Sequence, residues 1–196
     1  MKYTAHFFCI VCMLLPTGAS AFTFDLWTSG MTLTQTLDTA EKKDVPILRS
    51  GLISTNAHFD AAVCRPYADA FSDFSYRTTL LGKPATVTLH FTRRSRQLDV
   101  LRIAWGNIAS KSDFPGEVEA MLTKKYGNSK YGGPDIFFKL LRWDIDSDNF
   151  VIMKLGANVL ELKYVDKAGE KSGKREAASK ERKFKEEDLK KDQHKF

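Results

Sequence analysis

Three consecutive β-strand patterns between residues 74 and 105 constrain the fold more than any other feature. In residues 85–92 the apolar side chains Val87, Leu89 and Phe91 alternate with polar ones, a period of two that indicates a half-buried strand. The polar members of this alternation are Thr86, Thr88, His90 and Thr92. Residues 74–81 and 98–105 are rich in aromatic and branched side chains, and the turn signals at 82–84 and 93–97 are short. Short connections favour antiparallel pairing, so the sequence predicts a central β-meander.

A second set of strand patterns follows at residues 136–145, 150–155 and 159–165. In the last of these, Leu160, Leu162 and Tyr164 alternate with side chains that we expect to be mostly solvated. The solvated set is Val159, Glu161, Lys163 and Val165. The sequence therefore predicts a second meander with one apolar face.

A helix is expected to precede each meander. Thr32 and Gln35 fit a capping box, and Pro46 ends the first helical pattern. The second helix is predicted to begin after Asp113 and to end at Gly127. Its expected apolar stripe is Phe114, Val118, Met121, Leu122 and Tyr126. Residues 22–27 are expected to form a short strand or a packed N-terminal arm.

The order of helix and three strands thus occurs twice, at about residues 31–107 and 112–165. This order predicts an α+β protein of antiparallel β-meanders with helices packed on one face. The order of elements repeats while residue identity does not, so duplication is a hypothesis from pattern alone. One continuous sheet and two joined sheets both remain open.

This element order resembles the tandem helix-plus-meander architecture of the beta-lactamase inhibitor protein and of the small outer-membrane assembly lipoproteins. The resemblance covers residues 31–166. The chain departs from the lipoproteins because Phe8 and Val11 precede Cys9 and Cys12, where a lipoprotein signal has a small residue. It departs from the inhibitor because it lacks disulfide pairs. The resemblance implies a binding surface on the exposed sheet face and carries over no site residue.

The first 21 residues have the form of a secretory signal peptide. Lys2 is followed by an apolar run at 7–15 and by small residues at 19–21. The apolar run is shorter than the ~20 residues a membrane-spanning helix needs, so cleavage is favoured over a retained anchor. We expect a folded domain over residues 22–165, no transmembrane helix after signal removal, and a periplasmic or secreted location. An exported basic chain meets anionic envelope surfaces first, so nucleic acid is not an expected partner.

Signal removal leaves Cys64 as the one cysteine. A buried thiol is the favoured interpretation, because unpaired cysteine is among the most buried residue types. The alternative is a hydrolase or thiol enzyme that uses Cys64 with His58, near Asp60. No family signature surrounds this cysteine, so catalysis is the weaker hypothesis.

The expected function is binding without catalysis, with another envelope or extracellular protein as partner. The predicted binding surface is the polar sheet face around His90 and Arg102, with Arg93, Arg94 and Arg96 at its edge. No second His or Cys at metal spacing accompanies His90, so no metal is predicted there. No cofactor motif is found, and no cofactor is predicted.

Two other segments carry charge. Asp144, Asp146 and Asp148 alternate like the start of a calcium loop, but Asn149 and Leu155 stand where the glycine and the glutamate should be, so a polar turn is predicted. Residues 166–196 hold 11 Lys or Arg against 8 Asp or Glu, with few large apolar side chains. This tail is expected to be disordered or a frayed helix. Weak contact with an anionic surface through the tail is a further functional hypothesis.

Overall fold

The computed structural model describes residues 21–49, 72–108, 112–131 and 138–172, and residues 174, 175, 178, 179, 182 and 185 of the tail. The predicted signal peptide, apart from Ala21, lies outside these residues, as do His58, Asp60 and Cys64. Export and the thiol-enzyme hypothesis therefore stay predictions. Within the described ranges, no helix has the length and apolar character needed to cross a membrane.

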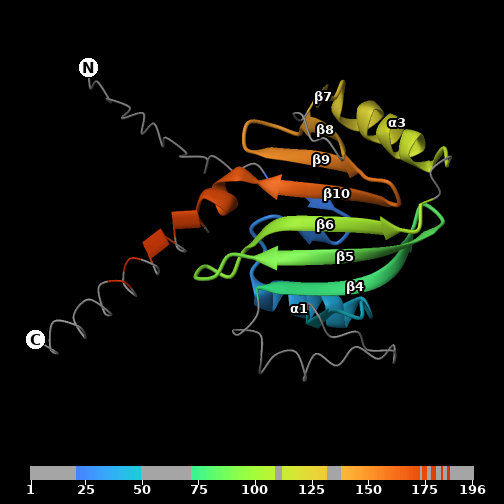
Figure 1. Ribbon diagram of the computed structural model, residues 1–196. Coiled ribbons are helices and arrows are strands. Elements are labelled where there is room, and N and C mark those ends of the chain that lie inside the picture. The colour runs from blue at the N-terminus through green and yellow to red at the C-terminus, as the bar shows by residue number, and fades with distance from the viewer. Residues whose placement is uncertain are drawn as a thin grey trace, which may run out of the picture.

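The two meanders form one eight-stranded sheet in the order β3-β4-β5-β6-β10-β9-β8-β7, and all neighbours are antiparallel (Figure 1). The strands are β3 (Leu48–Arg49), β4 (Asp73–Leu80), β5 (Lys83–Phe91), β6 (Leu98–Gly106), β7 (Lys130–Tyr131), β8 (Lys139–Asp144), β9 (Asn149–Leu155) and β10 (Val159–Asp166). The predicted α+β class is confirmed. Of the two arrangements left open by the sequence, the meanders adopt the single continuous sheet.

The halves meet where β6 pairs with β10, from Val159↔Gly106 to Val165↔Val100. Outward from this junction the order is the same on both sides: three long strands, then a two-residue edge strand that precedes the meander in the chain. Each half begins with a helix, α1 (Leu33–Lys42) or α3 (Phe114–Tyr126). The repeated element order of the sequence is therefore a repeated arrangement about the β6–β10 seam.

The helix ends follow the predicted caps with one exception. The Thr32 hydroxyl accepts from the Gln35 amide at 3.2 Å, and the Gln35 side chain accepts from the Thr32 amide at 2.8 Å, which completes the capping box. Gly127 ends α3 with φ 85°, as predicted. Asp113 makes no side-chain cap, and the Ser112 hydroxyl accepts from the Phe114 amide instead.

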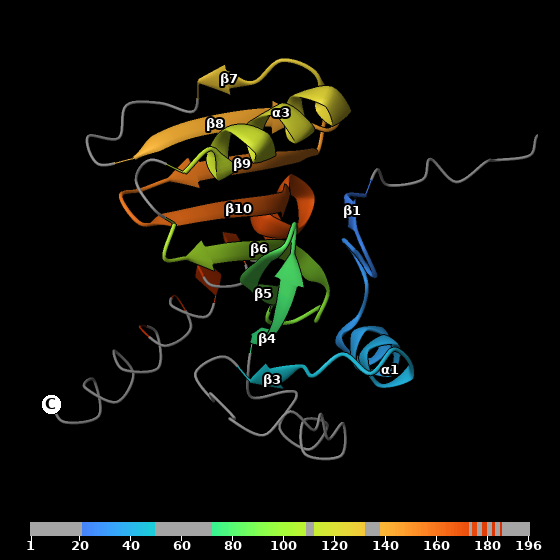
Figure 2. The ribbon, with the colours of Figure 1, turned by 90° about the vertical axis from the view of Figure 1, so that its right-hand side faces the viewer.

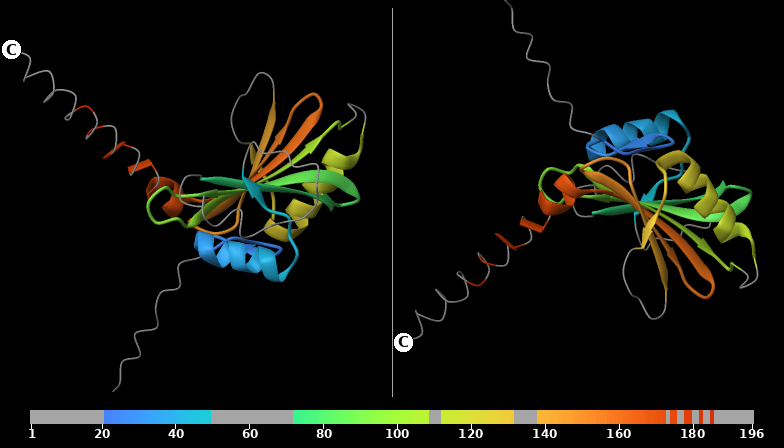
Figure 3. Two further views of the ribbon diagram at one scale, coloured as in Figure 1. Left: turned by 90° about the horizontal axis from the view of Figure 1, so that it is seen from below. Right: turned by 90° about the horizontal axis from the view of Figure 1, so that it is seen from above.

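Both helices and the N-terminal arm cover the same face of the sheet, as Figures 2 and 3 show for α1 and α3. Trp105 of β6 packs edge-on against Phe114 of α3, at 5.5 Å between ring centroids. The N-terminal arm is a small hairpin of β1 (Thr23–Phe24) and β2 (Trp27–Thr28). Its Trp27 indole donates to the Tyr76 hydroxyl at 2.9 Å. All the tryptophans, Trp27, Trp105 and Trp143, are buried in this core.

The β4–β5 turn differs from the expected one. The sequence predicted a turn at residues 82–84, but Leu80 pairs with Lys83, so the loop is Leu81 and Gly82. Both have positive φ, 52° and 73°, as a type I′ hairpin requires. Pro84 therefore lies inside β5 and is not part of the turn.

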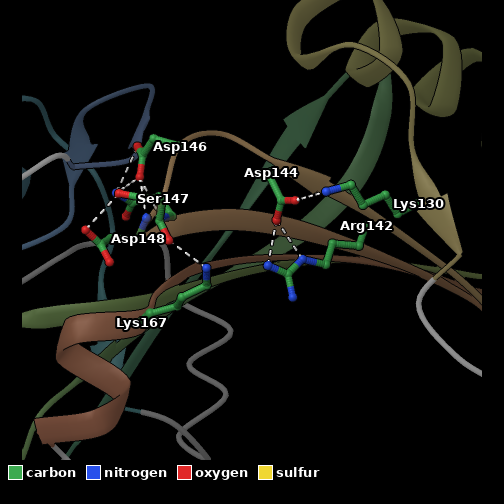
Figure 4. A network of polar contacts seen from close by, with 8 residues as sticks. Lys130, Arg142, Asp144, Asp146, Ser147, Asp148 and Lys167 are labelled. Atoms are coloured by element: carbon green, nitrogen blue, oxygen red, sulfur yellow. Dashed lines mark hydrogen bonds and ion pairs between the residues drawn. The ribbon is translucent and has the colours of Figure 1, made fainter.

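The tail begins as a helix over residues 167–172, and its first turn is held in place. The Asp166 carboxylate accepts from the amides of Ala168 and Gly169 at 2.8 and 3.2 Å. The Lys167 ammonium donates a hydrogen bond to the Ser147 carbonyl, in the β8–β9 turn, at 2.6 Å (Figure 4). A β-carbon added at Gly169 would lie 2.6 Å from the β-carbon of Asp99. The other described tail residues, at positions 174, 175, 178, 179, 182 and 185, are also helical, in agreement with the frayed-helix alternative.

The sheet face opposite α1 and α3, called the open face below, is not wholly wet. Val100, Phe150 and Val165 are neighbours on it through their strand pairings, and they are 8%, 8% and 1% exposed. The prediction that Val165 is solvated is therefore wrong. The first turn of the tail helix lies at this end of the sheet, beside Asp99, and Lys167 approaches the Phe150 ring at 5.8 Å.

Candidate functional site

Strand register aligns the side chains of the open face in rows that cross the sheet. One row runs through Ser75, Thr88, Arg102, Lys163, Ile152, Arg142 and Lys130, each directly opposite the next on the neighbouring strand. Four of its seven members are cations, on β6, β10, β8 and β7. This line of Arg102, Lys163, Arg142 and Lys130 is called the basic row below.

Carboxylates neutralise the basic row in part. Glu161 lies 3.5 Å from Arg102. Asp144 accepts from Lys130 at 2.7 Å and from Arg142 at 2.6 and 2.8 Å (Figure 4). The hydrogen bonds from Lys130 and Arg142 lower the pKa of the Asp144 carboxyl. Lys163 forms no ion pair with any described residue, so the middle of the row keeps an uncompensated positive charge.

His90 occupies the next row and is held by a buried carboxylate. Its Nδ1 donates to Oδ1 of Asp99 at 2.6 Å, and its Nε2 faces Oδ1 of Asp73 at 4.0 Å. The Asp99 side chain is 4% exposed and that of His90 is 43% exposed. The hydrogen bond to Asp99 raises the pKa of His90, although burial and the charge of Lys163 act against this. The Asp99 carboxylate therefore stabilises the imidazolium form of His90 relative to a free imidazole.

A β-bulge explains how Asp99 reaches His90. His90 pairs with Val100, but Phe91 pairs with Leu98, so Asp99 is an extra residue in β6. A bulge re-aims side chains and breaks the strict alternation of a strand. Asp99 is consequently buried between two apolar neighbours, yet turned to the histidine of the adjacent strand.

The hydrogen-bond partners of His90 bear on the chemistry that the pair can support. A histidine held by a buried acid at Nδ1 serves as a general base when a hydroxyl or thiol lies at its Nε2. Among the described residues, the hydrogen bond to Asp99 is the one that His90 makes, and the nearest charged group at Nε2 is the Asp73 carboxylate. Among the described residues, no hydroxyl or thiol is hydrogen-bonded to His90.

The predicted arginine loop is the turn between β5 and β6 and lies outside the paired strands. Arg93 and Arg94 are exposed in the turn between β5 and β6, and Arg96 is half-buried with φ 52°. The Arg96 carbonyl accepts from the amide of Leu33 at 2.9 Å, at the start of α1. This loop therefore holds the first residue of α1. His90 and Arg102 lie on the open face, where they were predicted.

The sequence reasoning missed Asp73, Asp99 and Lys163. Asp99 carried a usable signal, because a lone acid inside an otherwise apolar strand must find a partner or distort the strand. Lys163 stood on the expected wet side of its strand, but its place opposite Arg102 depends on register between distant strands.

The segment between β8 and β9, which carries Asp146 and Asp148, forms a polar turn, as predicted. Asp146 accepts from the amides of Asp148 and Asn149, both at 2.8 Å, whereas Asp144 is bound to the cations of the basic row. The two carboxylates thus serve separate hydrogen-bond networks (Figure 4). In the described ranges, no three His, Cys, Asp or Glu side chains converge as a metal site requires.

No protein-family model matches this chain, and comparisons with curated proteins and with solved structures likewise gave no match. The resemblance to the inhibitor and lipoprotein architecture therefore stays an expectation.

Proposed function

We propose that this chain is an exported binding protein that recognises an acidic surface of another envelope or extracellular protein through its open face. The observation that carries the proposal is the basic row. α1 and α3 pack on the opposite face; Arg102, Lys163 and Arg142 face outward from inner strands, and Lys130 lies on the edge strand β7.

Charge and rigidity support this assignment. Arg102, Lys163 and Arg142 lie on strands that pair on both sides, which limits the entropy lost when a partner binds. Lys163 retains its charge without an ion-pair partner in the described chain, and His90 adds a further positive charge when protonated. An acidic partner would gain attraction that steers its approach as well as contacts in the complex.

The test is capture from an envelope extract by residues 22–196, compared with a variant carrying Arg102→Gln and Lys163→Gln. The matched control is Lys42→Gln with Lys43→Gln, which removes the same charge from exposed positions at the end of α1. We expect the wild type and the control to capture the same protein, and the open-face variant to lose at least about tenfold in affinity, as expected for buried charge contacts.

Near-ultraviolet circular dichroism should be the same for all three proteins, because the tryptophans lie on the other face. Equal capture by the open-face variant and the control would refute the proposed surface. Loss in both would show a response to net charge alone and would refute it equally.

A further inference from the structure

We propose that the first turn of the tail helix covers an apolar patch beside the basic row, and that an acidic segment of the partner binds this patch by displacing that turn. This regulation rests on the binding function proposed above. The apolar patch consists of Val100, Val165 and Phe150, which lie side by side on β6, β10 and β9. A protein interface typically has an apolar centre and a polar rim.

The apolar patch is separate from the main hydrophobic core. Among the described residues, the main core holds the tryptophans but none of Val100, Val165 and Phe150. Arg102 follows Val100 by two residues and Lys163 precedes Val165 by two, so strand alternation places the patch on the same face as the basic row. Apolar side chains on that face are exposed unless a further element covers them. All three are nevertheless buried.

The first turn of the tail helix supplies the cover. Gly169 lies against Asp99, the residue before the patch in β6, and a β-carbon at Gly169 would be 2.6 Å from the Asp99 β-carbon. A residue without a side chain permits this close approach. Lys167 lies 5.8 Å from the centroid of the Phe150 ring, and the Arg142 guanidinium lies 4.1 Å from it. The helix start and Arg142 therefore shield the patch from water.

Few contacts attach the cover. Lys167 donates two hydrogen bonds to the β8–β9 turn, from its amide to the Asp148 carbonyl at 2.8 Å and from its ammonium to the Ser147 carbonyl at 2.6 Å. Beyond the first turn the helix projects away from the sheet (Figures 1 and 3), and its described positions from 171 onward are exposed, apart from the half-buried Ser179. Terminal elements with few buried contacts open most easily, so a ligand can displace this turn.

The charges beside the patch select an acidic segment that also carries apolar side chains. Arg102 and Lys163 are the cations next to the patch, and Lys163 forms no ion pair with a described residue. Asp144, opposite Phe150, is already bound by Arg142. An acidic apolar segment gains charge contacts and apolar burial, whereas an acidic polar one gains the charge contacts alone. Because binding requires the open state, the apparent affinity falls with the fraction of chains that are open.

The test uses the mature chain, residues 22–196, and rhodamine-labelled peptides of eight residues, followed by fluorescence anisotropy. The probe alternates glutamate and leucine, and glutamate–serine and lysine–leucine peptides are the matched controls. Gly169→Ala should bind the glutamate–leucine peptide at least about fivefold more tightly than the wild type, because its first turn is displaced from Asp99. Gly116→Ala, whose new β-carbon meets nothing within 4 Å, should change the affinity less than about twofold.

A second pair of variants tests the attachment by charge-matched changes. Lys167→Ala should tighten binding of the glutamate–leucine peptide at least about twofold although it removes a positive charge, because the bond to the Ser147 carbonyl is lost. Lys171→Ala removes the same charge from an exposed position of the same helix and should not tighten it. In ¹⁵N-labelled Gly169→Ala, the peptide should shift the amides of Val100 and Val165.

Equal affinities of the wild type and Gly169→Ala for the glutamate–leucine peptide would overturn the cover. An equal gain with the glutamate–serine or lysine–leucine peptide, or shifts centred away from the patch, would overturn it as well. A peptide gain in Gly169→Ala, together with equal partner capture by the open-face variant and its control, would refute the proposed function and retain the cover. The reverse pair of results would refute the cover alone.

Discussion

Replacing Gly169 with alanine should loosen the first turn of the tail helix from the sheet. The new β-carbon would lie 2.6 Å from the Asp99 β-carbon and 3.4 Å from its α-carbon. Carbon atoms in contact prefer about 3.5–4.0 Å, so the helix must retreat by about 1 Å. Such overpacking costs about 1–3 kcal/mol, while alanine gains up to about 1 kcal/mol over glycine within a helix. The expected net loss is about 0–2 kcal/mol.

Gly116→Ala in α3 is the matched control. A β-carbon at Gly116 meets nothing within 4 Å, so this variant should gain about 0.5–1 kcal/mol by helix propensity. Urea unfolding followed by tryptophan fluorescence should separate the two variants by about 1–3 kcal/mol. Hydrogen exchange should be faster at the amides of residues 168–172 in Gly169→Ala, because the helix no longer docks on Asp99. Equal gains in stability, with unchanged protection of the tail helix, would refute the close approach.

Three further outcomes follow from single contacts. Leu81→Asn should raise the free energy of unfolding by about 0.5–1 kcal/mol, since Leu81 has φ 52° and asparagine tolerates that conformation; unchanged urea midpoints would contradict this. Tyr76→Phe should lower it by about 1–3 kcal/mol, because the buried Trp27 indole loses its acceptor; a loss of a few tenths would argue against the bond. Asp99→Asn should lower the pKa of His90 in an NMR titration. Since that pKa is raised in the fold, the pair stabilises most below pH 6.5 and less as the pH rises through the folded pKa, and the variant should lose this dependence.

Local patterns were enough to predict most of the elements. The period of two located β5 and β10, and the Thr32 capping box located the start of α1, because these signals depend only on neighbours in the chain. The predicted stripe of α3 was less accurate, since Met121 is 41% exposed. The buried positions Phe114, Val118 and Leu122 are spaced by four residues, which leaves Met121 beside the contact.

Features that depend on distant parts of the chain could not be predicted. Val165 looks solvated within its own strand, but it is buried beside Phe150 and Val100, which come from other strands. Thr92 was placed on the polar side of its strand, yet β5 ends at Phe91, and Thr92 lies in the following loop and is 2% exposed. Its hydroxyl accepts from the Gln97 amide and so closes the loop.

The candidate site divides in the same way. Alternation alone placed His90 and Arg102 on the outward face. The basic row needed the register of strands from both halves, and the histidine–aspartate pair needed an extra residue in β6. Neither can be derived from the spacing of residues along one strand.

The seam between β6 and β10 also affects the order in which the chain can fold during synthesis. β6 is complete at Gly106, but its partner begins at Val159, about 50 residues later, or roughly 3 to 10 seconds of translation at 5–20 residues per second. During that interval the nascent chain presents an unpaired apolar strand edge, which invites pairing with other chains. A chain truncated within β10 would leave both half-sheets with unpaired edges. Such a truncation should therefore cause aggregation of the whole protein.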